Sequence, residues 1–116
     1  MARILFIDDD DSIRFLVQEE LSIDGHQVRV AADGPNGLLL AEQELPDLVI
    51  LDLKMPGMDG LEVLRRLKLT HPSLPVYLFT AYNDYSDTAC AMGADGYFVK
   101  SADLGPLRQR IRSLTE

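Results

Sequence analysis

The architecture of this 116-residue chain can be inferred from one segment, Pro46-Asp-Leu-Val-Ile-Leu-Asp-Leu-Lys-Met-Pro-Gly-Met-Asp-Gly60. Its apolar run Leu48–Leu51 is unbroken, which is typical of a strand covered on both faces in a parallel sheet. The run ends at Asp52, and Pro56-Gly57 then indicates a sharp turn. A carboxylate at the carboxyl end of a central parallel strand lies where open α/β sheets bind their ligands. Because aspartates are also common in turns, this segment alone leaves the role of Asp52 open.

Composition and charge restrict the classes of protein that fit. A hydrophobic content of 47% with 26% charged residues predicts one globular domain over residues 1–116. The formal net charge of -8 argues against direct contact with nucleic acid and suits a cation or a basic partner surface. Cys90 is the only cysteine, and no leader or membrane-length apolar segment is recognisable, so we expect a cytoplasmic protein without membrane contact. Cys90 falls on the apolar side of a predicted helix, where we expect it to pack.

Strand and helix patterns alternate along the chain. Apolar or alternating runs predict strands at 4–7, 27–31, 48–51, 76–79 and 96–99, and helical patterns follow over 13–21, 34–44, 59–70, 83–92 and 102–114. Five such alternations predict a three-layer α/β fold, with helices on both faces of a parallel sheet. No repeat or linker interrupts the pattern.

Polar side chains follow four of the predicted strands. The strands end, in chain order, at Asp8-Asp9, Asp52, Thr80 and Lys100. Because the carboxyl ends of parallel strands meet at one edge of a sheet, we expect these side chains to converge. Clustered carboxylates repel one another, and Mg²⁺ relieves that repulsion by binding carboxylate oxygens. With a hydroxyl and an ammonium group beside them, they predict a phosphoryl-binding site with a carboxylate as the acceptor.

Four motifs carry a resemblance to a known family. They are Ile-Asp-Asp-Asp at 7–10, Leu-Asp-Leu-Lys-Met-Pro-Gly-Met-Asp-Gly at 51–60, Phe-Thr-Ala at 79–81 and Gly-Ala-Asp-Gly-Tyr-Phe-Val-Lys at 93–100. In this order and spacing, the chain closely resembles the receiver domain of two-component response regulators over essentially its whole length. The resemblance implies a flavodoxin-like, doubly wound (βα)5 sandwich whose five parallel strands lie in the order 2-1-3-4-5.

The resemblance also implies a role for each acidic residue of the site. Asp52 would accept a phosphoryl group from a phosphohistidine on a sensor histidine kinase or phosphotransfer protein. Asp8, Asp9 and Asp52 would bind Mg²⁺ together with the backbone carbonyl of Lys54. The chain would then be a signalling phosphoacceptor that catalyses its own phosphorylation and hydrolysis, and not a turnover enzyme.

The other site residues would transmit the signal, according to the same resemblance. Thr80 and Lys100 would bind phosphoryl oxygens, and Tyr97 would change rotamer as Thr80 moves. The change would reach a surface formed by the fourth and fifth strands and the helices that follow them, where an output domain or effector protein binds. Receivers commonly have proline after the site lysine, joined by a cis peptide. Here Ser101 follows, and we expect the Lys100–Ser101 bond to remain cis.

A phosphorylation-dependent homodimer is a further candidate assembly. The last predicted helix carries Arg108, Arg110 and Arg112, and the helix before it carries Asp84 and Asp87. These opposite charges could pair across a symmetric interface. Two solvated helix faces are the plainer interpretation, since exposed charge pairs contribute little.

Three other interpretations stay open at this point. The spacing Asp8-x-Asp10-x-Ser12 is similar to a calcium-binding loop, but Ile13 occupies the position where that loop needs glycine. The same residues resemble the first motif of haloacid-dehalogenase-type phosphatases, in which Asp8 would be the nucleophile and Asp10 the acid/base. That reading leaves Asp52 without a role. A pseudo-receiver that keeps the fold without the chemistry is the third.

Overall fold

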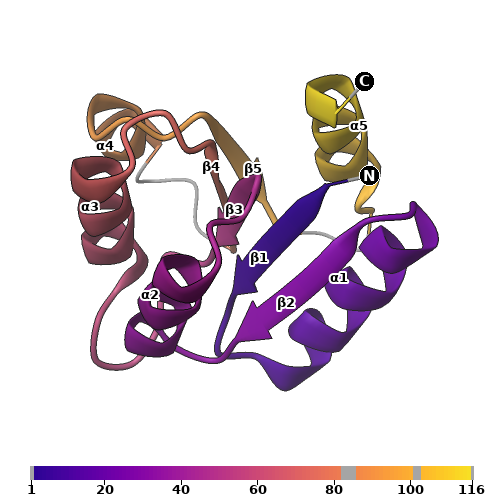
Figure 1. Cartoon of the computed structure of the whole chain (residues 1–116), viewed down its shortest axis with the longest axis horizontal. Coiled ribbons are helices and arrows are strands. Elements are labelled where there is room, and N and C mark those ends of the chain that lie inside the picture. Colours follow the sequence, from indigo (N-terminus) through magenta and orange to yellow (C-terminus); the bar gives the residue numbers. More distant parts are fainter. Residues whose placement is uncertain (1, 82–85, 101–102, 116) are drawn as a thin grey trace.

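The computed structural model describes residues 2–81, 86–100 and 103–115. Strands and helices alternate strictly along these residues (Figure 1). They are β1 (Arg3–Ile7), α1 (Asp11–Ile23), β2 (Gln27–Ala31), α2 (Gly34–Gln43), β3 (Leu48–Leu51), α3 (Gly60–Thr70), β4 (Val76–Thr80), α4 (Ser86–Ala91), β5 (Gly96–Val99) and α5 (Gly105–Thr115). The alternation is that of a βα repeat, as the apolar pattern predicts.

All five strands form one parallel sheet in the order β2-β1-β3-β4-β5, which confirms the predicted fold class and strand order. Ile7 at the end of β1 pairs with Leu51 at the end of β3, and Leu51 pairs with Leu78 of β4. The carboxyl ends of β1 and β3 are therefore level at one edge of the sheet, and β4 extends two residues farther, to Thr80. The residues that follow β1 and β3 come together at this edge.

The sheet separates two apolar cores, which explains the unbroken apolar runs. Helices α2, α3 and α4 lie on one side of it, and α1 and α5 lie on the other (Figure 1). Alternate strand residues such as Leu5 and Val49 enter the first core, and their neighbours Phe6 and Ile50 enter the second. Because side chains point to opposite faces in turn, a strand buried on both faces must be apolar at every position.

Two expectations about the C-terminal half are wrong in detail. The last helix begins at Gly105 and not at Ala102, because the Asp103 carboxylate accepts a hydrogen bond from the Gly105 N–H and Pro106 suits a first helical turn. Cys90 is exposed and does not pack in a core. The Lys100–Ser101 peptide and the start predicted for the fourth helix lie outside the described residues.

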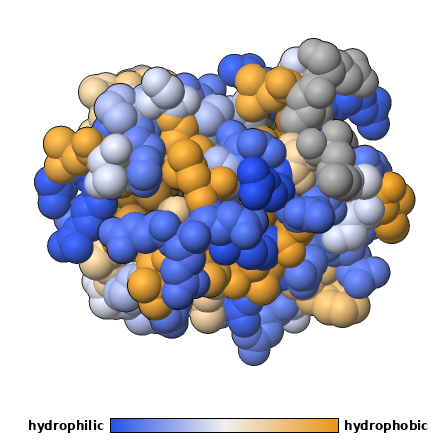
Figure 2. Space-filling model, in the orientation of Figure 1, coloured by the Kyte–Doolittle hydropathy of each residue, from blue (hydrophilic) through white to orange (hydrophobic). Residues whose placement is uncertain are grey.

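The outer surface is mixed in character. Hydrophilic side chains cover much of the face shown in Figure 2, with apolar ones interspersed among them. Within the described part of the chain, no helix combines the length and the apolar character that crossing a membrane requires.

Candidate functional site

Three carboxylates gather at the edge of the sheet where β1 and β3 end. One oxygen each from Asp8, Asp9 and Asp52 lies within 4.8 Å of the other two. Asp8 is fully buried and Asp52 is 4% exposed, whereas Asp9 is exposed. The cluster therefore has two buried carboxylates, Asp8 and Asp52, and one that faces solvent, Asp9. An ion can enter such a site from the solvent side.

Backbone hydrogen bonds continue the sheet through the two buried acids. The Asp8 N–H donates to the Ala31 carbonyl at 3.1 Å, and the Asp52 N–H donates to the Ile7 carbonyl at 2.9 Å. Asp8 is held further because its Oδ1 accepts the Asp10 N–H at 2.9 Å. Main-chain hydrogen bonds thus fix the backbone of both acids at the edge of the sheet.

Asp10, the next acid along the chain, has a structural task. Its Oδ1 accepts the N–H groups of Ser12 at 2.9 Å and Ile13 at 3.1 Å, so it caps the N-terminus of α1. A carboxylate used in this way is poorly placed to serve as the acid/base that a dehalogenase-type phosphatase would need. The segment from Asp8 to Ser12 also differs from a helix-loop-helix calcium site, because strand β1 and not a helix precedes it.

Lys100 brings a positive charge from β5 to the two buried acids. Its Nζ lies 2.7 Å from Asp8 Oδ2 and 3.5 Å from Asp52 Oδ2, and its side chain is 17% exposed. Although burial alone would lower the pKa of Lys100, its bond to Asp8 and the charges of both acids raise it, so the group stays protonated. The Lys100 N–H also donates to the Thr80 carbonyl at 2.6 Å, which ties the end of β5 to the end of β4.

The carboxyl group of Asp52 is strongly perturbed. Burial, followed by the charge of Asp8, raises the pKa of Asp52 from 3.8 to about 6, against the opposing effect of Lys100. A buried carboxylate held near a like charge is more basic than a free one. It is also poised to gain a cation, because a cation would offset both causes of the shift.

The loop after Asp52 contacts both its side chain and its backbone. The Lys54 N–H donates to the Asp52 carboxylate, while the Lys54 side chain is exposed. Gly60 begins α3 so close to this loop that a Cβ there would lie 2.2 Å from the Asp52 carbonyl oxygen. The sequence pattern predicts only that a helix begins near Asp59. The packing of α3 on the backbone of Asp52 shows why position 60 must lack a side chain.

Thr80 and Tyr97 occupy the neighbouring strands. Thr80 is fully buried at the end of β4, next to the strand that carries Asp52. Tyr97 of β5 is partly buried and packs against the core beneath α4. The structure therefore brings Asp8, Asp9, Asp52 and Lys100 into direct proximity, with Thr80 on the adjoining strand end and Tyr97 one strand farther out.

The donor set fits a hard divalent cation. Apart from the Lys100 ammonium, no described residue donates to the buried Asp8 Oδ2, so this oxygen has capacity for a further ligand bond. Three carboxylates against one lysine also leave an excess of negative charge. Carboxylate oxygens are the protein ligands that Mg²⁺ prefers.

Comparisons with known proteins agree on one family. The family model described as "Response regulator receiver domain" matches residues 4–112. Transcriptional regulatory protein AfsQ1 of Streptomyces coelicolor is 43% identical over 98% of this chain and 51% of its own length. Sporulation initiation phosphotransferase F of Bacillus subtilis is 38% identical over 95% of this chain and 90% of its own length.

Solved structures give the same result. Response regulator TrrA of Thermotoga maritima, crystallised in complex with Mg²⁺-BeF, has a TM-score of 0.93 at 37% identity and covers 98% of this chain and 99% of its own. TrrA in complex with histidine kinase ThkA has a TM-score of 0.91 at 38% identity, with full coverage of both chains. The chain spans about half the length of AfsQ1.

Proposed function

Because the chain belongs to the response regulator receiver domains of two-component signalling, we propose that Asp52 accepts a phosphoryl group from a phosphohistidine in an Mg²⁺-dependent step. The observation that carries the proposal is the cluster of Asp8, Asp9 and Asp52, whose oxygens lie within 4.8 Å of one another. The structure of TrrA in complex with Mg²⁺-BeF supports Mg²⁺ binding by a chain of this fold. In this chain the carboxylates of the cluster and the Lys54 carbonyl would hold Mg²⁺.

In the proposed reaction, an oxygen of Asp52 attacks phosphorus while the bond from phosphorus to the donor's imidazole nitrogen breaks. The electron pair of that bond leaves with the imidazole, so a carboxylate and a phosphohistidine become an acyl phosphate and a histidine. Mg²⁺, when bound, supplies positive charge that offsets the repulsion between the phosphoryl oxygens and the carboxylates. A pKa of about 6 keeps Asp52 largely ionised near pH 7 and also makes it a better nucleophile than an ordinary aspartate.

Lys100 and Thr80 would bind the phosphoryl oxygens once they arrive. The Nζ of Lys100 already lies between Asp8 and Asp52, so a small movement would bring it to an oxygen on Asp52. Thr80 would donate its hydroxyl from the adjoining strand. Since Thr80 and Lys100 are joined through their backbones at 2.6 Å, movement of one would displace the other. Tyr97 would follow by changing rotamer beside α4.

The surface around β4, α4, β5 and α5 would pass this change to an output domain or effector protein. The relative AfsQ1, which is named a transcriptional regulator and is about twice as long as the matched region, supports an output of this kind. Direct contact with nucleic acid is not part of the proposed role of residues 1–116. We treat these residues as one receiver domain, which would promote its own phosphorylation and hydrolysis without acting as a turnover enzyme.

The phosphoryl donor would be a sensor histidine kinase or a phosphotransfer protein. Helix α1 begins beside the acid cluster and exposes Phe15 (67%) and Leu16 (38%), which offers an apolar contact next to the acceptor. The complex of TrrA with a histidine kinase supports the same class of partner. A cytoplasmic location completes the proposal, and the exposed thiol of Cys90 is consistent with a reducing compartment.

Intact-mass measurement after incubation with acetyl phosphate tests the acceptor. The wild-type chain should gain one phosphoryl group with Mg²⁺ and none with EDTA, and Asp52→Asn should gain none under either condition. Asp8→Asn should still be modified at high Mg²⁺, although more slowly, because it loses a metal ligand and not the nucleophile. Peptide mapping after borohydride reduction should place the modification at position 52.

The opposite pattern would support the phosphatase interpretation. In that case Asp8→Asn would lose phosphoryl uptake, and Asp52→Asn would keep it. Asp33→Asn is a matched control, because Asp33 caps α2 and lies outside the acid cluster. Its uptake should equal that of the wild-type chain.

A further inference from the structure

Arg14 is an unusual residue for its position in α1. It lies in the first turn of the helix, where the helix dipole disfavours a cation. Its side chain is nevertheless 16% exposed and directed back over the helix N-terminus. A partly buried arginine near a helix N-terminus, where the dipole disfavours it, indicates a specific task for the guanidinium group.

The guanidinium group binds the segment between β1 and α1, which carries Asp8 and Asp9. Nη1 donates to the Asp8 carbonyl at 2.6 Å, and Nη2 donates to Asp11 Oδ1. The Asp8 carbonyl belongs to the peptide that joins Asp8 to Asp9. Fixing that peptide plane therefore restricts the directions in which the Asp9 side chain can leave the backbone.

Asp9 needs such support more than the other acids. Asp8 is held by the Asp10 N–H and Lys100, and Asp52 by the Lys54 N–H and Lys100. No side chain or backbone donor among the described residues holds the exposed Asp9 carboxylate. Its place in the cluster depends on the backbone that carries it, and Arg14 is the side chain bound to that backbone.

We propose that Arg14 is a positioning residue that orients Asp9 for Mg²⁺ and so sets the affinity of the acid cluster for the ion. The inference rests on the proposed Mg²⁺ site. Arg14 does not contact the ion or the phosphoryl group in this proposal. It acts through the Asp8–Asp9 peptide, as outer partners of metal ligands commonly do.

The positioning effect and the charge of Arg14 would change the affinity for Mg²⁺ in opposite directions, so substitutions of Arg14 can separate them. A cation near the site repels Mg²⁺, so if charge were the main effect, Arg14→Met would bind Mg²⁺ more tightly and Arg14→Lys would bind it as the wild-type chain does. If positioning is the main effect, both substitutions weaken binding, because lysine cannot bind two acceptors with a rigid fork.

Isothermal titration calorimetry with Mg²⁺ at fixed ionic strength measures the difference. Arg14→Met and Arg14→Lys should each raise the Mg²⁺ dissociation constant about tenfold, the lower end of the range for outer partners of metal ligands. Arg65 offers a matched control, since it makes an analogous bond to Glu62 three residues away on α3. Arg65→Met and Arg65→Lys should leave the constant unchanged.

Urea unfolding without Mg²⁺ establishes that each variant is folded, and Arg14→Lys serves if Arg14→Met does not fold. An unchanged constant for Arg14→Lys, or tighter binding by Arg14→Met, would overturn the inference while leaving the Mg²⁺ site intact. If the wild-type chain itself binds no Mg²⁺, the proposed function fails first.

Discussion

Asp52 combines two properties that oppose each other: it is 4% exposed, and its proposed role as phosphoacceptor requires an ionised carboxylate. Its pKa in the folded chain is about 6, above the ordinary value of 3.8. Between these two values the folded state binds more protons than the unfolded state, so stability is fully present below pH 3.8 and falls as the pH rises through 6. A shift of this size corresponds to about 3 kcal/mol.

Asp52→Asn should therefore stabilise the chain in the absence of Mg²⁺. At pH 8 we expect its free energy of unfolding to exceed that of the wild-type chain by about 1–3 kcal/mol, because the amide has no charge to desolvate. The difference should shrink towards zero near pH 4, where Asp52 is protonated. Urea titrations followed by circular dichroism at several pH values measure this. A difference that does not depend on pH would show that ionisation of Asp52 is not its cause.

Single residues of the site were predictable only where strand polarity places them. Asp8, Asp9, Asp52 and Lys100 each follow an apolar strand, and the parallel sheet brings them together. The use of Asp10 as a helix cap could not be separated from metal binding by spacing alone, because both need a carboxylate just after a strand.

At the scale of elements, α3 is the one most tightly fitted to the acceptor. A Cβ at Gly60 would lie 2.2 Å from the Asp52 carbonyl oxygen and 2.6 Å from the Leu53 Cα, and both are backbone atoms that cannot rotate away. The Gly60 N–H also donates to the Leu53 carbonyl at 2.7 Å. Helix α3 and the acceptor loop must therefore move together.

Gly60→Ala should destabilise the chain by about 1–3 kcal/mol, as overpacking does, and should also slow phosphorylation by displacing Asp52. Gly105→Ala is a matched control at the first residue of α5, where the atoms nearest to the added Cβ all belong to the Asp103 carboxylate, with Oδ1 at 2.8 Å. That carboxylate is the end of a side chain and not backbone, so we expect a smaller change than at Gly60. Urea unfolding and the acetyl phosphate assay give the two measurements. Equal effects of the two substitutions would contradict the fit of α3 to the acceptor.

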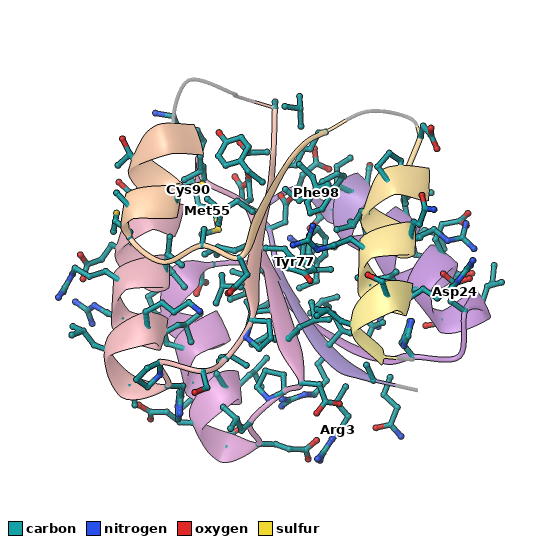
Figure 3. The ribbon with its side chains drawn as sticks, turned by 90° about the horizontal axis from the view of Figure 1, so that it is seen from above. Arg3, Asp24, Met55, Tyr77, Cys90 and Phe98 are labelled. Carbon is teal, nitrogen blue, oxygen red and sulfur yellow. The ribbon has the colours of Figure 1, made fainter. Side chains whose placement is uncertain are left out.

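Helix α5 shows what a charge pattern cannot predict. Arg108 forms a two-bond contact with Asp24 at 2.6 and 2.8 Å and reaches Glu20 at 2.8 Å, so it joins α5 to the end of α1. Figure 3 shows Asp24 at the end of α1, beside α5. Arg110 bonds to the Asp95 carbonyl and lies 5.7 Å from the ring of Tyr77. Both arginines have partners within the chain. A dimer face that relies on them stays a prediction, and Asp84 lies outside the described residues.

For the whole molecule, the fold was predictable because two independent signals agreed. The unbroken apolar runs predicted a sheet that is buried on both faces, and the helical patterns between them predicted the helices that pack on those faces. The features that could not be predicted are those that depend on local bonds and tertiary contacts, such as the start of a helix or the exposure of one of its side chains. Helix α5 starts three residues late because Asp103 turns the chain, and Cys90 faces solvent although its helical neighbours suggested a core.

The acid cluster also links Mg²⁺ to the stability of the whole chain. An ion that binds only the folded state stabilises it by RT ln(1 + [L]/Kd), which is about 2.7 kcal/mol at a hundredfold excess over the dissociation constant. We expect Mg²⁺ to raise the melting temperature of the wild-type chain by several degrees at pH 8. Asp52→Asn should respond less, because it has already lost one ligand and its share of the repulsion among the three carboxylates.

General screening is the competing explanation, since a chain with a net charge of -8 gains stability from any salt. Sodium chloride at matched ionic strength separates the two effects, because screening depends on ionic strength while the site depends on the ion. A melting temperature that rises equally with both salts would remove the support for a Mg²⁺ site. A rise with Mg²⁺ that Asp9→Asn reduces and Asp33→Asn does not would place the effect at the three carboxylates where β1 and β3 end.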